Sequence, residues 1–105
     1  MNNINLNFFD FTGNGKVLAL SGRPKGEKIR EEWKLDDLEK NTDNVFIVNI
    51  PKEMYGLSPS LIQGIFTKTI DTLGKQNFYE RYKFSPHESL LSMVQLGIDG
   101  IPDKQ

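Results

Sequence analysis

Two glycines and two cationic residues lie close together in the stretch GRPKG at residues 22–26. Gly22 and Gly26 would let a ligand approach the backbone closely, Arg23 and Lys25 supply positive charge, and Arg30 adds a further cation. A helix predicted to begin just after this stretch would direct free N–H groups at a phosphate or carboxylate. The stretch lacks the spacing of a P-loop, and a flexible basic turn is the simpler interpretation. It is therefore a candidate anion site.

A second candidate is the turn at residues 56–60, which precedes a predicted helix. Ser58 is suited to cap that helix, and Pro59 suits its first position. A phosphate added to the hydroxyl of Ser58 or Ser60 would meet the positive end of the helix dipole. The plainer alternative is that Ser58 is only a cap and Ser60 a first-turn residue. The candidates for partner binding or phosphorylation are Tyr55, Gly56, Ser58 and Ser60.

Aromatic side chains gather near the two ends of the same helix. They are Tyr55, Phe78, Tyr79 and Tyr82, and Trp33 is predicted on another helix. Packing in the core is the simpler role for several of them. If Tyr55 is exposed together with Tyr79 or Tyr82, the pair could anchor a protein partner.

The sequence offers no recognisable catalytic or metal-binding arrangement. His87 is the only histidine, cysteine is absent, and nothing in the pattern brings His87 to a serine and an acid. The neighbouring carboxylates Asp36 and Asp37 lie on a charged helical face and are most simply solvated. We expect no catalytic residue, no metal and no cofactor.

The candidate turn lies between two strongly patterned segments. Residues 44–50 (NVFIVNI) form a short apolar run rich in β-branched residues, which predicts a central strand. Because both parities of the run are apolar, we expect both faces of this strand to be covered. Residues 58–74 then show helical periodicity, with a capping serine at the start and Gly74 as the predicted stop.

The N-terminal segment predicts an antiparallel hairpin. Residues 4–12 and 16–21 are the two strands, and Gly13-Asn14-Gly15 is the turn, since these residues tolerate positive φ angles. The remaining predicted elements are a helix from Glu27 with Ile29, Trp33 and Leu38 facing inward, a short helix at 36–40, a connection at 75–79, an edge strand at 81–84, and a last helix capped by Ser85, Pro86 and Glu88.

The order of these elements predicts a small single-domain α/β fold. We expect a mixed sheet of about four strands flanked by about three helices, with parallel pairing after the hairpin. A chain of 105 residues makes one domain, with a core over 4–98 and a loose tail at 99–105. Its net charge of −1 and ordinary composition favour a cytoplasmic protein that binds neither nucleic acid nor membrane.

The combined pattern resembles the small STAS-like domains of bacteria and phages, distant relatives of the anti-sigma-factor antagonists. The similarity covers nearly all of 4–98, and its motifs are moderately specific together and weak singly. The classical turn reads Asp-Ser-Ser-Gly, whereas Pro59 follows Ser58 here and Leu61 replaces a phenylalanine. The matching residues are Gly22, Arg23, Gly26, Arg30, Ser58, Ser60, Leu73, Gly74 and Phe78.

The resemblance implies a non-enzymatic regulatory module that binds a protein partner. The implied partner is a histidine-kinase-like ATPase, and phosphorylation of Ser58 or Ser60 is the implied switch. Two alternatives remain open. One is a nucleotide or phosphate sensor that uses residues 22–26, and the other is a subunit that self-associates through an open sheet edge at residues 4–12.

Overall fold

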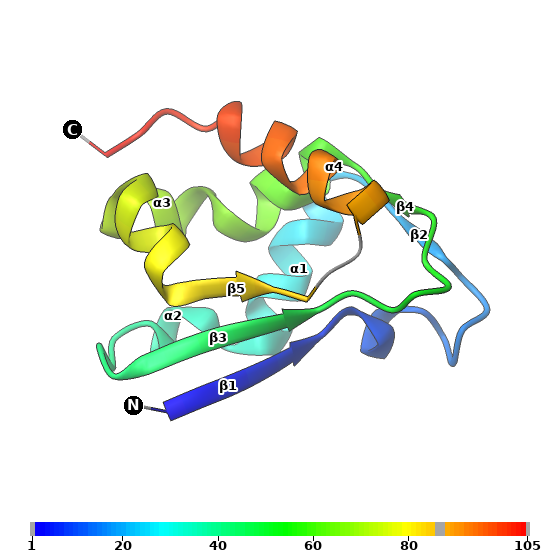
Figure 1. Ribbon diagram of the computed structural model, residues 1–105, viewed down its shortest axis with the longest axis horizontal. Helices are drawn as coiled ribbons and strands as arrows, with labels where there is room; N and C mark the ends of the chain where they lie inside the picture. The colour runs from blue at the N-terminus through cyan, green and yellow to red at the C-terminus, as the bar shows by residue number, and fades with distance from the viewer. Residues whose placement is uncertain (1, 86–87, 105) are drawn as a thin grey trace.

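The computed structural model describes residues 2–85 and 88–104 and shows an α/β fold, which confirms the predicted class (Figure 1). Helices lie above and behind a small sheet whose strands run in one direction. The elements in chain order are β1 (Asn2–Asn7), the 3-10 helix η1 (Phe8–Phe11), β2 (Ala19–Leu20), α1 (Arg23–Trp33), α2 (Leu35–Leu38), β3 (Asn44–Asn49), β4 (Gly56–Leu57), α3 (Pro59–Arg81), β5 (Tyr82–Phe84) and α4 (Glu88–Asp99).

All strand pairing among the described residues is parallel. The main sheet has the order β1-β3-β5, and β2 pairs with β4 in a separate two-stranded sheet. The central position of β3 and the edge position of β5 were predicted correctly. The predicted hairpin was wrong, and so was the mixed sheet that depended on it. After β1, η1 buries Phe8, and the positive-φ turn at Gly13-Asn14-Gly15 leads to β2, which lies in the other sheet.

The helices cover only one face of the main sheet. Along β3 the side chains alternate, with Phe46 and Val48 fully buried and Val45 and Ile47 half-buried. The expectation that both faces are covered was therefore wrong. Helices α1 and α3 each connect two parallel strands of neighbouring position, and right-handed crossovers of this kind place both helices on the same side. Among residues 2–85 and 88–104, no element forms a layer on the opposite side.

Helix α3 begins as predicted and extends further than predicted. Ser58 is its N-cap, and the backbone breaks at Gly74, where φ is +81°. The chain then continues as helix to Arg81, so the connection expected at residues 75–79 is helical. Phe78 is fully buried in this second part and packs against Phe66 and Tyr82. Its burial holds the extension against the core.

Helix α1 begins earlier than predicted and packs closely on α3. Its first residue is Arg23, so residues 22–26 form the cap and first turn of a helix and not a loop. A Cβ atom on Gly26 would lie 2.2 Å from the carbonyl oxygen of Leu61, and one on Gly64 would lie 2.3 Å from that of Arg23. Only glycine at these two positions permits the observed backbone contact.

The C-terminal residues pack on the fold, in contrast to the expected loose tail. Ile101 is buried, and the Asp103 carboxylate accepts a hydrogen bond of 2.8 Å from the backbone N–H of Lys75. The short helix near 36–40 is present as α2, and α4 occupies the position of the last predicted helix. The cap proposed for α4 involves Pro86 and His87, which lie outside the described residues. Within the described part of the chain, no helix has the length and apolar character needed to cross a membrane.

Candidate functional site

A groove of about 390 Å³ lies between the β2–β4 pair and α4. Two features determine its position. Strand β4 leads directly into α3, and helix α4 packs against both β4 and α3 (Figure 1). The groove combines apolar side chains with serine hydroxyls. Its lining is formed by Ala19, Leu20, Ser21, Tyr55, Gly56, Leu57, Ser58, Ser89, Leu90 and Met93.

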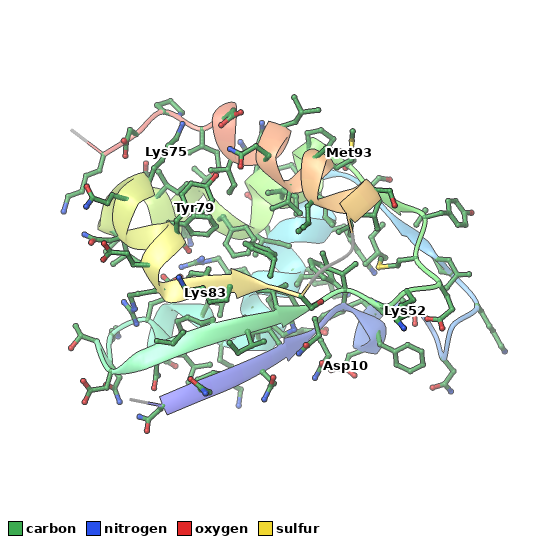
Figure 2. The ribbon with its side chains drawn as sticks, in the orientation of Figure 1. Asp10, Lys52, Lys75, Tyr79, Lys83 and Met93 are labelled. Atoms are coloured by element: carbon green, nitrogen blue, oxygen red, sulfur yellow. The ribbon has the colours of Figure 1, made fainter. Side chains whose placement is uncertain are left out.

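Tyr55 is the most exposed large hydrophobic side chain of the groove, with 75% of its surface accessible. Its backbone is held firmly, because its N–H donates to the Leu18 carbonyl over 2.9 Å and the preceding Met54 is buried. A fixed backbone with an exposed aromatic ring is a suitable arrangement for an interface anchor, since little conformational freedom is lost on binding. Figure 2 shows Met93 on α4, which supplies the apolar wall across from the strands.

Ser58 joins the beginnings of α1 and α3. Its Oγ accepts hydrogen bonds from the backbone N–H groups of Leu61 and Gly22, each over 3.1 Å. The Oγ of Ser60 lies 3.0 Å from the Oγ of Ser58, and the two hydroxyls form a hydrogen bond. Ser60 itself is exposed. Of the two predicted phosphorylation candidates, Ser58 is committed to capping and Ser60 is accessible.

The structure separates the five residues of the candidate anion site. Gly22 caps α1 with a φ of +95°, and Arg23 and Lys25 are exposed on its first turn. Arg23 and Lys25 line different hollows, the first between α1 and α3 and the second beside Asp10. Gly26 is buried in the crossing of the two helices, where its role is to permit close packing. Arg23 and Arg30 line the same hollow, whereas Lys25 lines another.

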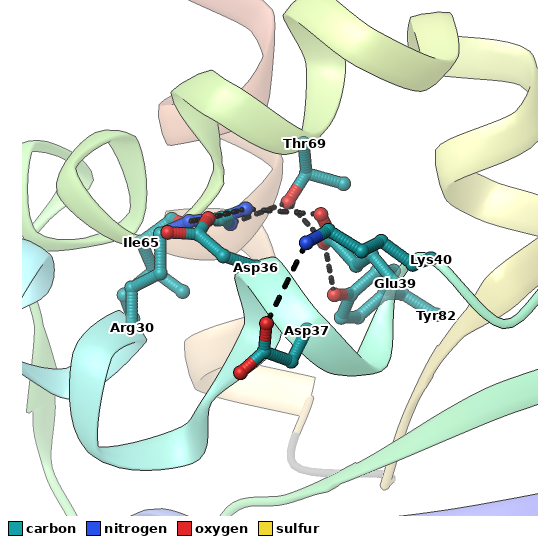
Figure 3. A network of polar contacts seen from close by, with 8 residues as sticks. All are labelled: Arg30, Asp36, Asp37, Glu39, Lys40, Ile65, Thr69 and Tyr82. Carbon is teal, nitrogen blue, oxygen red and sulfur yellow. Dashed lines mark hydrogen bonds and ion pairs between the residues drawn. The ribbon is translucent and has the colours of Figure 1, made fainter.

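Arg30, the remaining anion candidate, is buried and fully engaged within the protein (Figure 3). Its Nη1 donates to the Ile65 carbonyl over 2.9 Å and to the Thr69 hydroxyl over 2.7 Å. Its Nη2 lies 2.9 Å from carboxylate oxygens of both Asp36 and Glu39. The guanidinium therefore connects α1 to α2 and α3, and it has no donor directed to a ligand.

Glu39 is the centre of the same network. Its carboxylate is largely buried and accepts hydrogen bonds from the hydroxyls of Thr69 and Tyr82 as well as from Arg30. Burial raises the pKa of Tyr82 well above its ordinary value, and the charge of Glu39 raises it further. The hydrogen bond from Arg30 lowers the pKa of Asp36, which is mostly exposed. These groups stabilise one another. A hollow of about 330 Å³ lies beside them, and it is also lined by Lys40, Lys68, Asp71 and Thr72.

Sequence reasoning missed this network, although the helix carried a signal for it. Gly26, Ile29, Arg30 and Trp33 are spaced as one face of a helix, and all four are buried. An arginine on a face otherwise formed by small and apolar residues must find partners inside the protein. Glu39 gave no comparable signal, because it lies in a stretch with the exposed charged residues Asp36, Asp37 and Lys40.

The predicted aromatic patch is divided between the core and two separate surfaces. Phe78 and Tyr82 are buried, while Tyr79 is partly exposed and accepts a hydrogen bond from the Gln95 side chain. Tyr79 lies on the second part of α3 (Figure 2) and does not line the groove to which Tyr55 belongs. Tyr55 and Tyr79 therefore do not act as a pair.

Across the described residues, no group of three or more histidine, cysteine, aspartate or glutamate side chains is placed to hold a metal ion. Comparison of the chain with protein-family models, with curated proteins and with solved structures gives no match. A functional interpretation therefore depends on the groove, on the two helix starts that meet at Ser58, and on the chemistry of the residues around them.

Proposed function

We propose that the protein is a non-enzymatic regulatory module that binds a protein partner through the groove between β2–β4 and α4. The observation that carries the proposal is the exposed ring of Tyr55, on a backbone that is hydrogen-bonded to Leu18, beside an apolar groove. Large aromatic side chains at the edge of a hollow are typical anchors of protein interfaces. Met93, with the buried Leu90 behind it, would contact an apolar side chain of the partner.

The partner class and the switch come from the resemblance to STAS-like domains. A histidine-kinase-like ATPase is the partner that this resemblance implies. The position of Ser60 supports this residue as the phosphorylation site. Ser60 is exposed at the positive end of α3, where a phosphate would be favourably placed. A phosphate there would also lie beside the groove and would change the charge that a bound partner meets.

An anion sensor at residues 22–26 has less support. Arg30 is fully occupied by internal partners, and Gly26 is covered by α3. The hollow of Arg23 also contains the cations Arg30 and Lys68, but the acidic side chains of Glu27, Glu31 and Asp36 in its lining oppose the binding of a phosphate. The groove is therefore the better candidate.

The test is a pull-down from the native host with three matched variants. Tyr55→Ala and Met93→Glu alter the groove, whereas Leu96→Ala removes an exposed apolar side chain of α4 that does not line it. We expect a stoichiometric partner to be captured by the parent protein and by Leu96→Ala, and to be lost with both groove variants. Thermal unfolding of each variant shows whether the fold is retained. Capture that is equally strong with all variants would refute the groove as the binding surface.

The proposed switch is tested on the same material by intact mass measurement and peptide mapping. A phosphate on Ser60 is the expected result, because its hydroxyl is the accessible one. A phosphate on Ser58 alone would contradict this assignment, since modification there removes the acceptor that two backbone N–H groups share. Protein without phosphate that still captures the partner would retain the binding module and exclude the switch.

A further inference from the structure

The strand β1 forms an open edge of the main sheet. It pairs with β3 on one side, and no other described element pairs with it on the other side (Figure 1). The residues Asn3, Asn5 and Asn7 are exposed along its length. An unpaired strand of this kind presents a row of backbone N–H and C=O groups that can pair with another chain.

The free backbone groups belong to the odd-numbered residues. The N–H of Asn2 donates to the Asp43 carbonyl over 2.9 Å and is therefore directed toward β3. Because consecutive residues of a strand direct their hydrogen-bonding groups to opposite sides, those of Asn3, Asn5 and Asn7 are directed away from β3. The carbonyl of Asn7 caps η1, and the other backbone groups of these three residues lie along the open edge with no described partner.

Nothing in the sequence of β1 protects this edge. Natural edge strands are usually short, or they carry charges or proline that prevent pairing with another molecule. The sequence NNINLN spans six residues and contains neither a charged residue nor proline. The opposite edge, β5, has three residues and includes the exposed Lys83. The two edges of one sheet therefore differ in how readily they accept a new strand.

The side chains of β1 favour a second copy of the same strand as the partner. An asparagine amide contains both a donor and an acceptor, so two identical amides can hydrogen-bond to each other, whereas two identical charges repel. The structure already contains two such amide pairs on this sheet, Asn2 with Asn44 over 3.2 Å and Asn49 with Asn5 over 3.3 Å. The edge is thus complementary to itself in charge and in hydrogen bonding.

We propose that two copies of the protein associate through β1 in antiparallel pairing centred on Asn5. This register places Asn5 opposite Asn5, Asn3 opposite Asn7, and Ile4 opposite Leu6 of the other copy. It uses the N–H and C=O groups of Asn5, the C=O of Asn3 and the N–H of Asn7, giving about four hydrogen bonds, and it extends the sheet across both molecules. The inference is independent of the groove, which lies on other elements.

Disulfide cross-linking tests the register directly, because the protein contains no cysteine. In Asn5→Cys the two thiols would face each other in a hydrogen-bonded pair, with Cα atoms about 5.5 Å apart, within the range of a disulfide. Asn7→Cys is the matched control on the same strand and face, since its two copies would be about 14 Å apart. We expect rapid formation of a cross-linked dimer with Asn5→Cys and little with Asn7→Cys. Equal cross-linking of both variants would refute the register.

A second experiment separates edge pairing from loss of folding. In Asn5→Pro the missing N–H is one directed away from β3, so pairing within the molecule is retained while the edge is interrupted. Asn5→Thr keeps the N–H and is the matched control. Light scattering at high concentration should give about twice the 12.0 kDa chain mass for the parent protein and for Asn5→Thr, and the single-chain mass for Asn5→Pro. A parent protein that stays monomeric, or an Asn5→Pro dimer, would overturn the proposal.

Discussion

Replacing Gly26 with alanine places a methyl group where α1 and α3 are in backbone contact. The added carbon would lie 2.2 Å from the carbonyl oxygen of Leu61 and 3.0 Å from the Cα of Gly64. The obstructing atoms belong to the backbone, so no side-chain rotation relieves the clash. Ordinary contact begins at 3.4 Å, and the helices must therefore separate by roughly 1 Å.

The size of the effect follows from opposing contributions. Alanine favours a helix over glycine by up to about 1 kcal/mol, which alone would stabilise the variant. Overpacking costs about 1–3 kcal/mol, and separation of the helices also stretches the hydrogen bonds from Arg30 to Ile65 and from Gly22 to Ser58. Weakening a buried charge network adds about 1–3 kcal/mol. We expect Gly26→Ala to lower the free energy of unfolding by about 2–4 kcal/mol.

Urea denaturation followed by circular dichroism measures this change, and Gly100→Ala is the matched control. A Cβ on Gly100 would meet the end of the flexible Gln63 side chain, which can move aside, so its effect should stay within about 0.5 kcal/mol. The midpoint of thermal unfolding of Gly26→Ala should fall by roughly 10–20 °C. A Gly26→Ala protein as stable as the parent would refute the helix-contact reasoning and would return Gly26 to the set of candidate ligand-binding residues.

Four further substitutions test the polar contacts. Ser58→Ala should cost about 1–2 kcal/mol of unfolding free energy in urea denaturation, because two N–H groups lose their acceptor, while Ser60→Ala should change it by less than about 0.5 kcal/mol. Glu39→Ala should cost about 3–5 kcal/mol in the same assay, because Arg30 loses a buried partner. Asp36→Asn tests pH dependence. Because the folded-state pKa of Asp36 lies below 3.8, its ionised form stabilises the fold above that pH, and this contribution is lost as the pH falls through the lowered value. Urea denaturation across acidic pH should therefore show a deficit for Asp36→Asn of at most about 1 kcal/mol at neutral pH that disappears in acid.

The elements predicted correctly are those whose signals are local. Ser58 and Pro59 mark the start of α3 because a cap and a fixed φ act within one turn of the helix. The β-branched run at 44–49 marks the central strand for a similar reason. The predicted parallel pairing of β3 with β5 follows from the handedness rule for strand–helix–strand units. In each case the required information lies in a short window of sequence.

The failures concern contacts between residues far apart in sequence. The Gly13-Asn14-Gly15 turn forms with the expected positive φ angles, yet β1 pairs with β3, 42 positions along the chain, and not with its neighbour. The stretch at 22–26 resembles a ligand-binding loop because a glycine can serve either the approach of a ligand or the close packing of two helices. The sequence of the stretch does not distinguish these two roles. Its actual role depends on Gly64, which no local pattern connects to it.

Only one wall of the groove consists of residues that the sequence had singled out. Tyr55, Gly56 and Ser58 do line one groove, as their closeness in sequence allowed. Leu90 and Met93, which form its other wall, have the same spacing as the core residues of α4 and could not be distinguished from them. A groove forms only where two elements meet, so the sequence pattern of one element cannot indicate which residues the other contributes.

The two proposed surfaces lie on different parts of the molecule, which has a consequence for binding. The groove lies beside α4 and β4, whereas β1 lies at the far edge of the sheet (Figure 1). Pairing through β1 would therefore leave both grooves of a dimer open. If the partner is immobilised densely on a sensor chip, one dimer could bind two partner molecules at once. Two linked contacts dissociate more slowly than one, without any change in the individual groove. Asn5→Pro should then release the coated surface faster than Asn5→Thr while binding a partner free in solution equally well. Equal release rates from the surface would show that the two surfaces do not act together.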